Sequence, residues 1–196
     1  MWILTNNNTY KPKVNYGDFF GKYNNFLFYN DFKNDNLSIS PNRNIFLDGF
    51  IIPRLEVYEK YSVFKSPIDL LEHLFDDFGH NFIFKIKGSF VIIIYEKEEI
   101  HLYNDYHSFK KFFYNLNSSP YIAVSADLKV VLNLTNHSVS YENIALFAIM
   151  EHFINGYTLF DEVFFSQPGI HLTINTRTSK FTIRKYFDPV SLILKP

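Results

Sequence analysis

The segment Phe90-Val91-Ile92-Ile93-Ile94-Tyr95 is apolar at every position. A strand with one face in water alternates apolar and polar residues, so an unbroken apolar run indicates a strand that is covered on both faces. Other elements must therefore pack on each side of it. A chain of 196 residues, of which 47% are hydrophobic, can form one well-packed core, and we expect a single domain over residues 1–196.

Helix and strand signals occur in blocks along the chain. Ser66-Pro67-Ile68-Asp69 supplies an N-cap, a first-turn proline and a capping-box-like acid, and Gly79 ends this predicted helix. Blocks of strands and helices, rather than strict alternation, indicate an α+β fold with layers of antiparallel sheet and helix. The other predicted elements are strands at 81–87, 88–96 and 101–104, a helix from Ser140 to Gly156, and a hairpin over 171–175 and 180–187.

Composition excludes several classes of function. The chain has no cysteine, so these residues form no disulfide, no thiolate metal site and no cysteine nucleophile. The formal net charge of −1 lacks the positive field that nucleic acids and anionic membranes attract. The longest apolar run is too short to span a bilayer, and the N-terminus has no signal-peptide pattern. We expect a cytoplasmic protein with no nucleic-acid and no membrane partner.

Several short motifs occur in a characteristic order. They are Leu47-Asp48-Gly49-Phe50, Lys87-Gly88-Ser89-Phe90, Tyr103-Asn104-Asp105-Tyr106, Thr158-Leu159-Phe160-Asp161-Glu162-Val163, Gln167-Pro168-Gly169 and Arg184-Lys185-Tyr186-Phe187-Asp188-Pro189. Their order and spacing resemble the class II glutamine amidotransferase domain at the N-terminus of asparagine synthetases, best over residues 48–189 and weakly over 1–45. The resemblance implies the N-terminal-nucleophile hydrolase fold, a four-layer α/β/β/α sandwich of two antiparallel sheets between helical layers.

The resemblance also implies that the nucleophile and the oxyanion donor are absent. In the family an N-terminal cysteine attacks the glutamine amide, whereas the matching residue here is Trp2, whose indole is no nucleophile. Asp48 replaces an asparagine that donates to the developing oxyanion, and a carboxylate repels that charge. Gly49 is retained, while Phe50 replaces the glutamate of the same motif.

The substrate clamps differ as well. Lys87, next to Gly88, matches the aspartate that holds the α-amine of glutamine, and a lysine there repels an ammonium group. Asn36 matches the arginine that binds the carboxylate of glutamine. We therefore predict a degenerate glutamine pocket with no catalytic residue, no cofactor and no glutaminase activity. Its residues are Trp2, Asn36, Asp48, Gly49, Phe50, Lys87 and Gly88.

One histidine cluster raises the question of a metal site. His101, Asp105 and His107 are close in sequence, but the turn at Asp105 would have to bring His107 back toward the strand that holds His101. A turn histidine and a structural aspartate are the better interpretation, and we expect no metal.

Two functions follow from these observations. The first is an inactive amidotransferase-like domain that is a structural or docking companion of a separate ATP-dependent amide-forming or peptide-modifying protein, with some of its many aromatic side chains at the interface. The alternative is an enzyme or small-ligand binder that reuses the former glutamine pocket. The alternative predicts that Asp48, Lys87 and Asp105 converge in an open pocket, whereas a pocket plugged by Trp2 and Phe50 favours docking.

Overall fold

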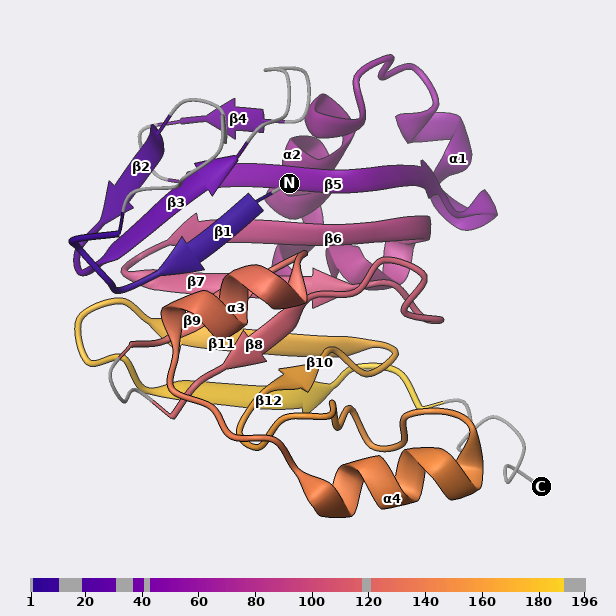
Figure 1. Ribbon diagram of the computed structural model, residues 1–196. Coiled ribbons are helices and arrows are strands. Elements are labelled where there is room, and N and C mark those ends of the chain that lie inside the picture. Colours follow the sequence, from indigo (N-terminus) through magenta and orange to yellow (C-terminus); the bar gives the residue numbers. More distant parts are fainter. Residues whose placement is uncertain (1, 11–18, 31–36, 41–42, 118–120, 189–196) are drawn as a thin grey trace. The chain divides into compact units, whose positions relative to one another are not determined.

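The computed structural model describes residues 2–10, 19–30, 37–40, 43–117 and 121–188. The chain divides into two compact units, each with its own antiparallel sheet (Figure 1). The first unit comprises Met1–Phe32, Lys111–Gln167 and Thr176–Lys180, and the second comprises Lys33–Lys110, Pro168–Asn175 and Phe181–Pro196.

The second unit is built around the apolar run. Its sheet has the order β12-β11-β7-β6-β5-β4, with antiparallel pairing throughout. Residues on both faces of β6 are buried, including Phe90 and Val91 at 0% exposure. The predicted doubly covered strand is confirmed. The strands are β4 (Leu37–Ile39), β5 (Arg43–Pro53), β6 (Ile86–Glu96), β7 (Glu99–Asn104), β11 (Ile170–Asn175) and β12 (Phe181–Lys185).

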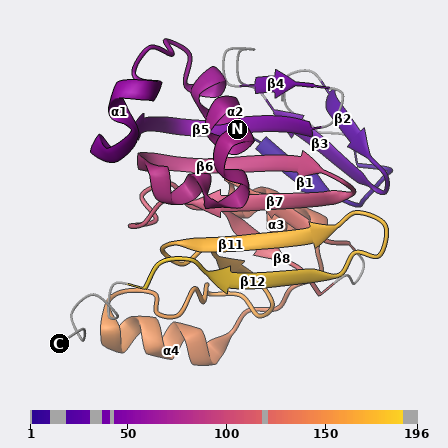
Figure 2. The same cartoon turned by 180° about the vertical axis from the view of Figure 1, so that it is seen from behind.

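Helix α2 (Pro67–Phe78) covers one face of this sheet, and Figure 2 shows it in front of β5 and β6. Ser66 caps the helix, because its hydroxyl accepts the backbone N–H of Asp69, and Gly79 ends it at a φ of +53°. The predicted helix is confirmed. Leu71 and Leu74 are fully buried against the sheet, and burial of each stabilises the fold by about 1.5–3 kcal/mol. A short helix, α1 (Leu55–Tyr61), precedes it.

The strand predicted over 81–87 is wrong. Gly79–Lys85 forms a 3₁₀ helix, η2, and β6 begins directly after it at Ile86. The segment contains three adjacent apolar residues, Phe82, Ile83 and Phe84, followed by Lys85-Ile86-Lys87. Phe82 and Ile83 are nevertheless both buried, which a helical turn allows and a strand with one wet face does not.

The first unit has a sheet of the order β10-β8-β9-β1-β3-β2, again antiparallel. Helix α3 (Leu128–Leu134) packs on it through Val130, Val131 and Leu134. The strands are β1 (Trp2–Thr5), β2 (Phe19–Tyr23), β3 (Phe26–Asn30), β8 (Phe113–Asn115), β9 (Ala123–Ser125) and β10 (Phe164–Phe165).

Helix α4 (Tyr141–Met150) begins after the Ser140 cap as predicted but ends at Glu151, which adopts a left-handed conformation, rather than near Gly156. None of its residues is buried.

The α+β class is confirmed. Each unit by itself has an antiparallel sheet with a helical layer packed on it, as the predicted fold requires. The predicted C-terminal hairpin is present as β11 and β12. In the described part of the chain, no helix has the length and apolar character that crossing a membrane requires.

Candidate functional site

Asp48 lies on β5 and is nearly buried, with 5% of the residue exposed. Its carboxylate is 2.8 Å from the ammonium nitrogen of Lys110, whose side chain is 44% exposed. A carboxylate accepts hydrogen bonds and donates none when it is ionised. The side chain therefore supplies a paired negative charge at the position where the sequence predicts the loss of an oxyanion donor.

Gly49, Phe50, Lys87 and Gly88 lie beside one another where β5 pairs with β6. Gly49 and Gly88 have φ angles of +121° and +149°. A Cβ atom on Gly49 would lie 2.1 Å from the carbonyl oxygen of Ser89, and one on Gly88 would lie 2.2 Å from that of Phe50. Close backbone approach alone thus requires both glycines. The side chains of Phe50 and Lys87 are exposed.

Trp2 belongs to the core of the first unit. Its side chain is fully buried, its backbone carbonyl accepts the hydroxyl of Ser125 at 2.8 Å, and its ring centroid is 6.2 Å from that of Phe112. The predicted pocket residues are thus divided between the units, with Trp2 in the first and the β5 and β6 residues in the second. Asn36 lies outside the described residues.

Asp105 organises a turn, as expected of a structural aspartate. Its carboxylate accepts the backbone N–H groups of Phe90, His107, Phe109 and Lys110 at 2.9–3.3 Å. Asp48 is thus paired with Lys110, and Asp105 holds the turn. The ligand-binding alternative expects Asp48, Lys87 and Asp105 to converge in an open pocket, and these hydrogen bonds lend it no support.

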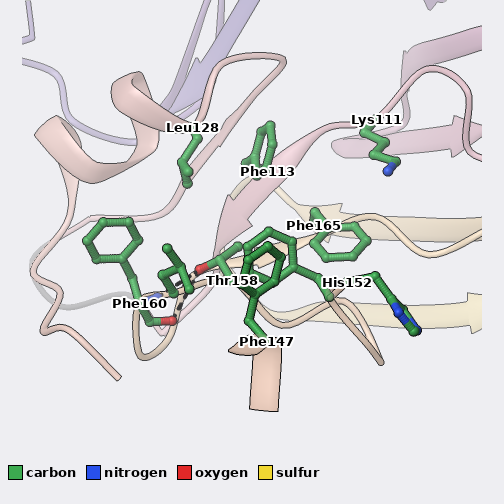
Figure 3. Close-up of a pocket in the computed structure, with 10 residues that line it drawn as sticks. Lys111, Phe113, Leu128, Phe147, His152, Thr158, Phe160 and Phe165 are labelled. Atoms are coloured by element: carbon green, nitrogen blue, oxygen red, sulfur yellow. Dashed lines mark hydrogen bonds between the residues drawn. The ribbon is translucent and has the colours of Figure 1, made fainter. Parts of the chain in front are cut away.

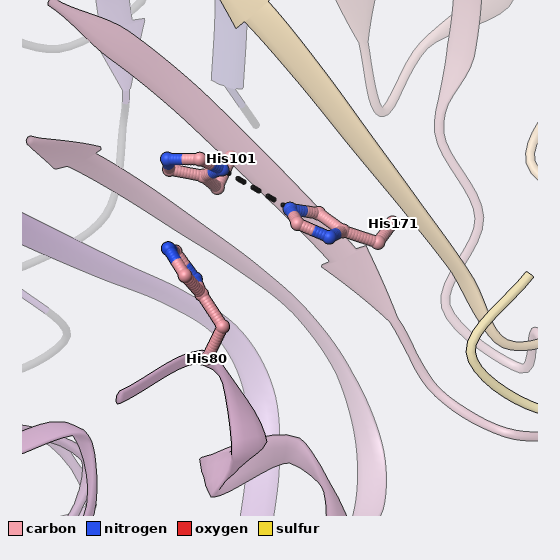
Figure 4. Close-up of side chains that lie close together, drawn as sticks. All are labelled: His80, His101 and His171. Atoms are coloured by element: carbon pink, nitrogen blue, oxygen red, sulfur yellow. Dashed lines mark hydrogen bonds between the residues drawn. The ribbon is translucent and has the colours of Figure 1, made fainter. Parts of the chain in front are cut away.

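A different set of histidines converges in the second unit. His80 on η2, His101 on β7 and His171 on β11 place one ring nitrogen each within 4.8 Å of the others (Figure 4). Burial first, and neighbouring positive charge second, lower the pKa of His101 to about 3 and that of His171 to about 4. The sequence could not indicate this cluster, because it depends on the pairing of β7 with β11 and on the 3₁₀ turn.

The first unit contains a cavity of about 470 Å³ beside α4 (Figure 3). Its lining is mostly aromatic and aliphatic, and Lys111 and His152 supply its charged or titratable groups. The cavity has no local signal in the sequence, because its walls come from α3, α4, β8, β10 and the loop that follows α4. The lining residues are Lys111, Phe113, Leu128, Phe147, His152, Phe153, Thr158, Leu159, Phe160 and Phe165.

Comparison with known protein families assigns the chain to one of them. Residues 42–187 match the family model described as glutamine amidotransferase domain. The chain therefore belongs to the glutamine amidotransferase domain family, and the resemblance to its class II members is confirmed. A comparison with curated proteins found no match.

Two solved structures are similar in fold at low identity. One, described as the allosteric regulatory enzyme of purine biosynthesis, is 14% identical, with a TM-score of 0.45 over 77% of this chain and 30% of that one. The other is glutamine phosphoribosylpyrophosphate amidotransferase from B. subtilis complexed with ADP and GMP, which is 13% identical, with a TM-score of 0.47 over 83% of this chain and 35% of that one. The chain thus spans about a third of the length of each.

Proposed function

We propose that this chain is a glutamine amidotransferase-like domain without glutaminase activity, which docks on a separate ATP-dependent amide-forming or peptide-modifying protein. The observation that carries the proposal is the ion pair of Asp48 with Lys110. A buried carboxylate at the position matched to the oxyanion donor raises the energy of the negative charge that amide hydrolysis develops.

The missing nucleophile supports the same conclusion. Glutamine hydrolysis in this family forms a covalent acyl intermediate, which needs a group that can attack the amide carbon. These residues include no cysteine, and Trp2 is packed in the first unit with its carbonyl bound by Ser125.

Helix α4 supports the docking part of the proposal. Its sequence is almost entirely apolar, yet Tyr141 is 83% exposed and Ile149 is 76% exposed. A helix that is hydrophobic all round is normally covered, and the neighbouring cavity can accept an apolar anchor residue of a partner. The helix has no lysine or arginine, so a protein surface suits it better than a phosphate backbone. The asparagine synthetase resemblance favours an ATP-dependent amide-forming partner.

The first test is direct measurement of glutaminase activity. Purified protein is incubated with glutamine, and glutamate and ammonia are measured beside a glutaminase-competent class II amidotransferase. We expect no product above the non-enzymatic rate. Turnover comparable to that of the control enzyme would overturn the inactive assignment.

The second test addresses docking. The tagged chain is used to recover partners from its native host, and each candidate is purified and assayed for ATP-dependent amide formation. We expect capture of such an enzyme to require α4, so that a double variant, Tyr141→Lys with Ile149→Lys, loses it. Phe109→Lys, at a site in the second unit that is 75% exposed, is the matched control and should retain it. Failure to recover an ATP-dependent amide-forming or peptide-modifying enzyme, or equal capture by all variants, would contradict the proposal.

A further inference from the structure

Three imidazoles from distant parts of the chain point at one small region of the second unit. Nδ1 of His101 lies 3.1 Å from Nε2 of His171, and the ring centroids of His80 and His101 are 4.4 Å apart. His101 is buried, His171 is half-buried and His80 is exposed. The cluster therefore has two fixed members and one member on the solvent side, through which an ion can enter.

The spacing is that of a metal site. Zinc binds imidazole nitrogen at about 2.0–2.1 Å with tetrahedral geometry, so neighbouring ligand nitrogens are about 3.3 Å apart. The separation of 3.1 Å between the nitrogens of His101 and His171 is close to this value. A ring nitrogen of the third ligand, His80, lies within 4.8 Å of both, and this side chain is exposed. Rotation of the His80 side chain can therefore bring its nitrogen to the distance that three zinc ligands require.

Groups around the imidazoles have the chemistry of an outer shell. The carboxylate of Glu99 is 3.6 Å from Nε2 of His101, on the opposite side of the ring from Nδ1. At this distance the pair is an electrostatic contact and not a hydrogen bond; it places a negative charge beside the imidazole, as outer-shell carboxylates do. The hydroxyl of Thr173 lies 3.1 Å from Nε2 of His171 and 3.3 Å from Nδ1 of His101, on the nitrogens that face each other.

His80 has a comparable environment. Its Nε2 is 3.2 Å from the carboxylate of Glu96, and its Nδ1 is 2.6 Å from the hydroxyl of Tyr103. With either nitrogen toward the ion, the other retains a partner. The fourth ligand position is then left to water, as in open zinc sites.

The charges of the region are compatible with a cation. Glu96 and Glu99 contribute two carboxylates, while Arg184, opposite His171 on β12, contributes the opposing positive charge.

We propose that His80, His101 and His171 bind one divalent transition-metal ion of the class that prefers nitrogen ligands, for which zinc is the reference. The site differs from the β5 and β6 residues of the predicted glutamine pocket. His171 lies on β11 and Asp48 on β5, with β7 and β6 between them, so about 14 Å separates the two strands at a spacing of about 4.8 Å. The proposal therefore does not depend on the proposed function, and it assigns a site to histidines that the family resemblance leaves without a role.

The test uses untagged protein, freed of metal with a chelator and dialysed. Zn²⁺ binding is measured by competition with a chromophoric chelator, and Co²⁺ binding by the intense visible absorption of tetrahedral cobalt. We expect one ion per chain. His171→Gln and His80→Gln should each weaken binding at least tenfold, as loss of even an outer-shell group costs about 10- to 100-fold.

His107→Gln is the matched control, because His107 is exposed and belongs to the rival set His101, Asp105 and His107. It should bind as the wild type does. Circular dichroism of each variant establishes that it is folded, and the two exposed or half-exposed positions are chosen so that the buried His101 stays intact. Wild-type protein that binds no stoichiometric Zn²⁺ or Co²⁺ would overturn the proposal. Equal affinity of the wild type and His171→Gln would overturn it as well.

Discussion

At the scale of single residues, Gly49 and Gly88 show how a family motif can persist for reasons of backbone geometry. Both have positive φ, and a Cβ at either position would collide with a carbonyl oxygen of the paired strand. Their retention therefore carries no information on catalysis. Asp48, which is paired with Lys110, is the more informative neighbour.

We predict that Gly49→Ala and Gly88→Ala each lower the free energy of unfolding by at least about 2 kcal/mol, through backbone strain and the collision with carbonyl oxygen. Urea unfolding followed by circular dichroism measures the change. Gly79→Ala is the matched control, because its φ is +53° and nothing lies within 4 Å of its added methyl group. It should cost about 1 kcal/mol. Equal losses of unfolding free energy at all three positions would show that collision with the carbonyl oxygens is not the cause.

The buried His101 predicts a pH dependence of the metal-free protein. Burial, with the nearby charges of His80 and His171, lowers its folded-state pKa to about 3, whereas the unfolded chain has a pKa of about 6.5. The unfolded state therefore binds the additional proton as the pH falls below about 6.5, and stability falls with it. Between pH 7 and pH 5 the loss from His101 is about 2 kcal/mol.

Urea unfolding in the presence of a chelator measures this loss. His101→Asn removes the titrating ring and should flatten the dependence between pH 7 and pH 5, although the variant starts less stable. The other groups that face His101 are His80, His171, Glu99 and Thr173. His107→Gln, at an exposed position, should keep the wild-type dependence. A wild-type protein equally stable at both pH values would contradict the burial of a neutral imidazole.

At the scale of elements, the sequence predicted correctly those helices whose ends are set by neighbouring residues. Helix α2 has an N-cap, a first-turn proline, a terminating glycine and a buried apolar face, and all of these are legible in sequence. The strand predicted over 81–87 was wrong because a short apolar run fits a buried strand and a buried helical turn equally well. Here Phe82 and Ile83 are both buried in the core of their unit. Helix α4 was placed correctly at its start but ends early, at the left-handed Glu151.

Helix α4 carries the element-scale prediction. Ile149 is 76% exposed and none of the helix is buried, so Ile149→Lys should change the free energy of unfolding by no more than about 0.5 kcal/mol. Thermal unfolding and urea titration measure this. Leu134→Lys, on the buried face of α3, is the contrasting variant and should unfold the protein or destabilise it by several kcal/mol. Marked destabilisation by Ile149→Lys would mean that α4 is a structural rather than a docking element.

At the scale of the whole molecule, the sequence predicted the family and the α+β class, because both follow from local motifs in their order along the chain. It did not predict the histidine cluster or the cavity beside α4. His80, His101 and His171 meet through the pairing of β7 with β11 and through η2, an element for which the sequence indicated a strand. Long-range pairing of this kind has no local signature.

Metal binding should therefore stabilise the molecule unevenly. An ion held by η2, β7 and β11 ties together segments that are distant in sequence, and at a free concentration of about 100 times its dissociation constant it suppresses any opening that breaks the site by about 100-fold. Native-state hydrogen exchange measures this directly. Amides of η2 should exchange up to about 100-fold more slowly with Zn²⁺ than with chelator. Those of α4, which lies in the first unit and exchanges by its own local opening, should be unchanged. His171→Gln should abolish the difference in η2, and uniform slowing of both helices would show that the ion acts on global unfolding instead of at this site.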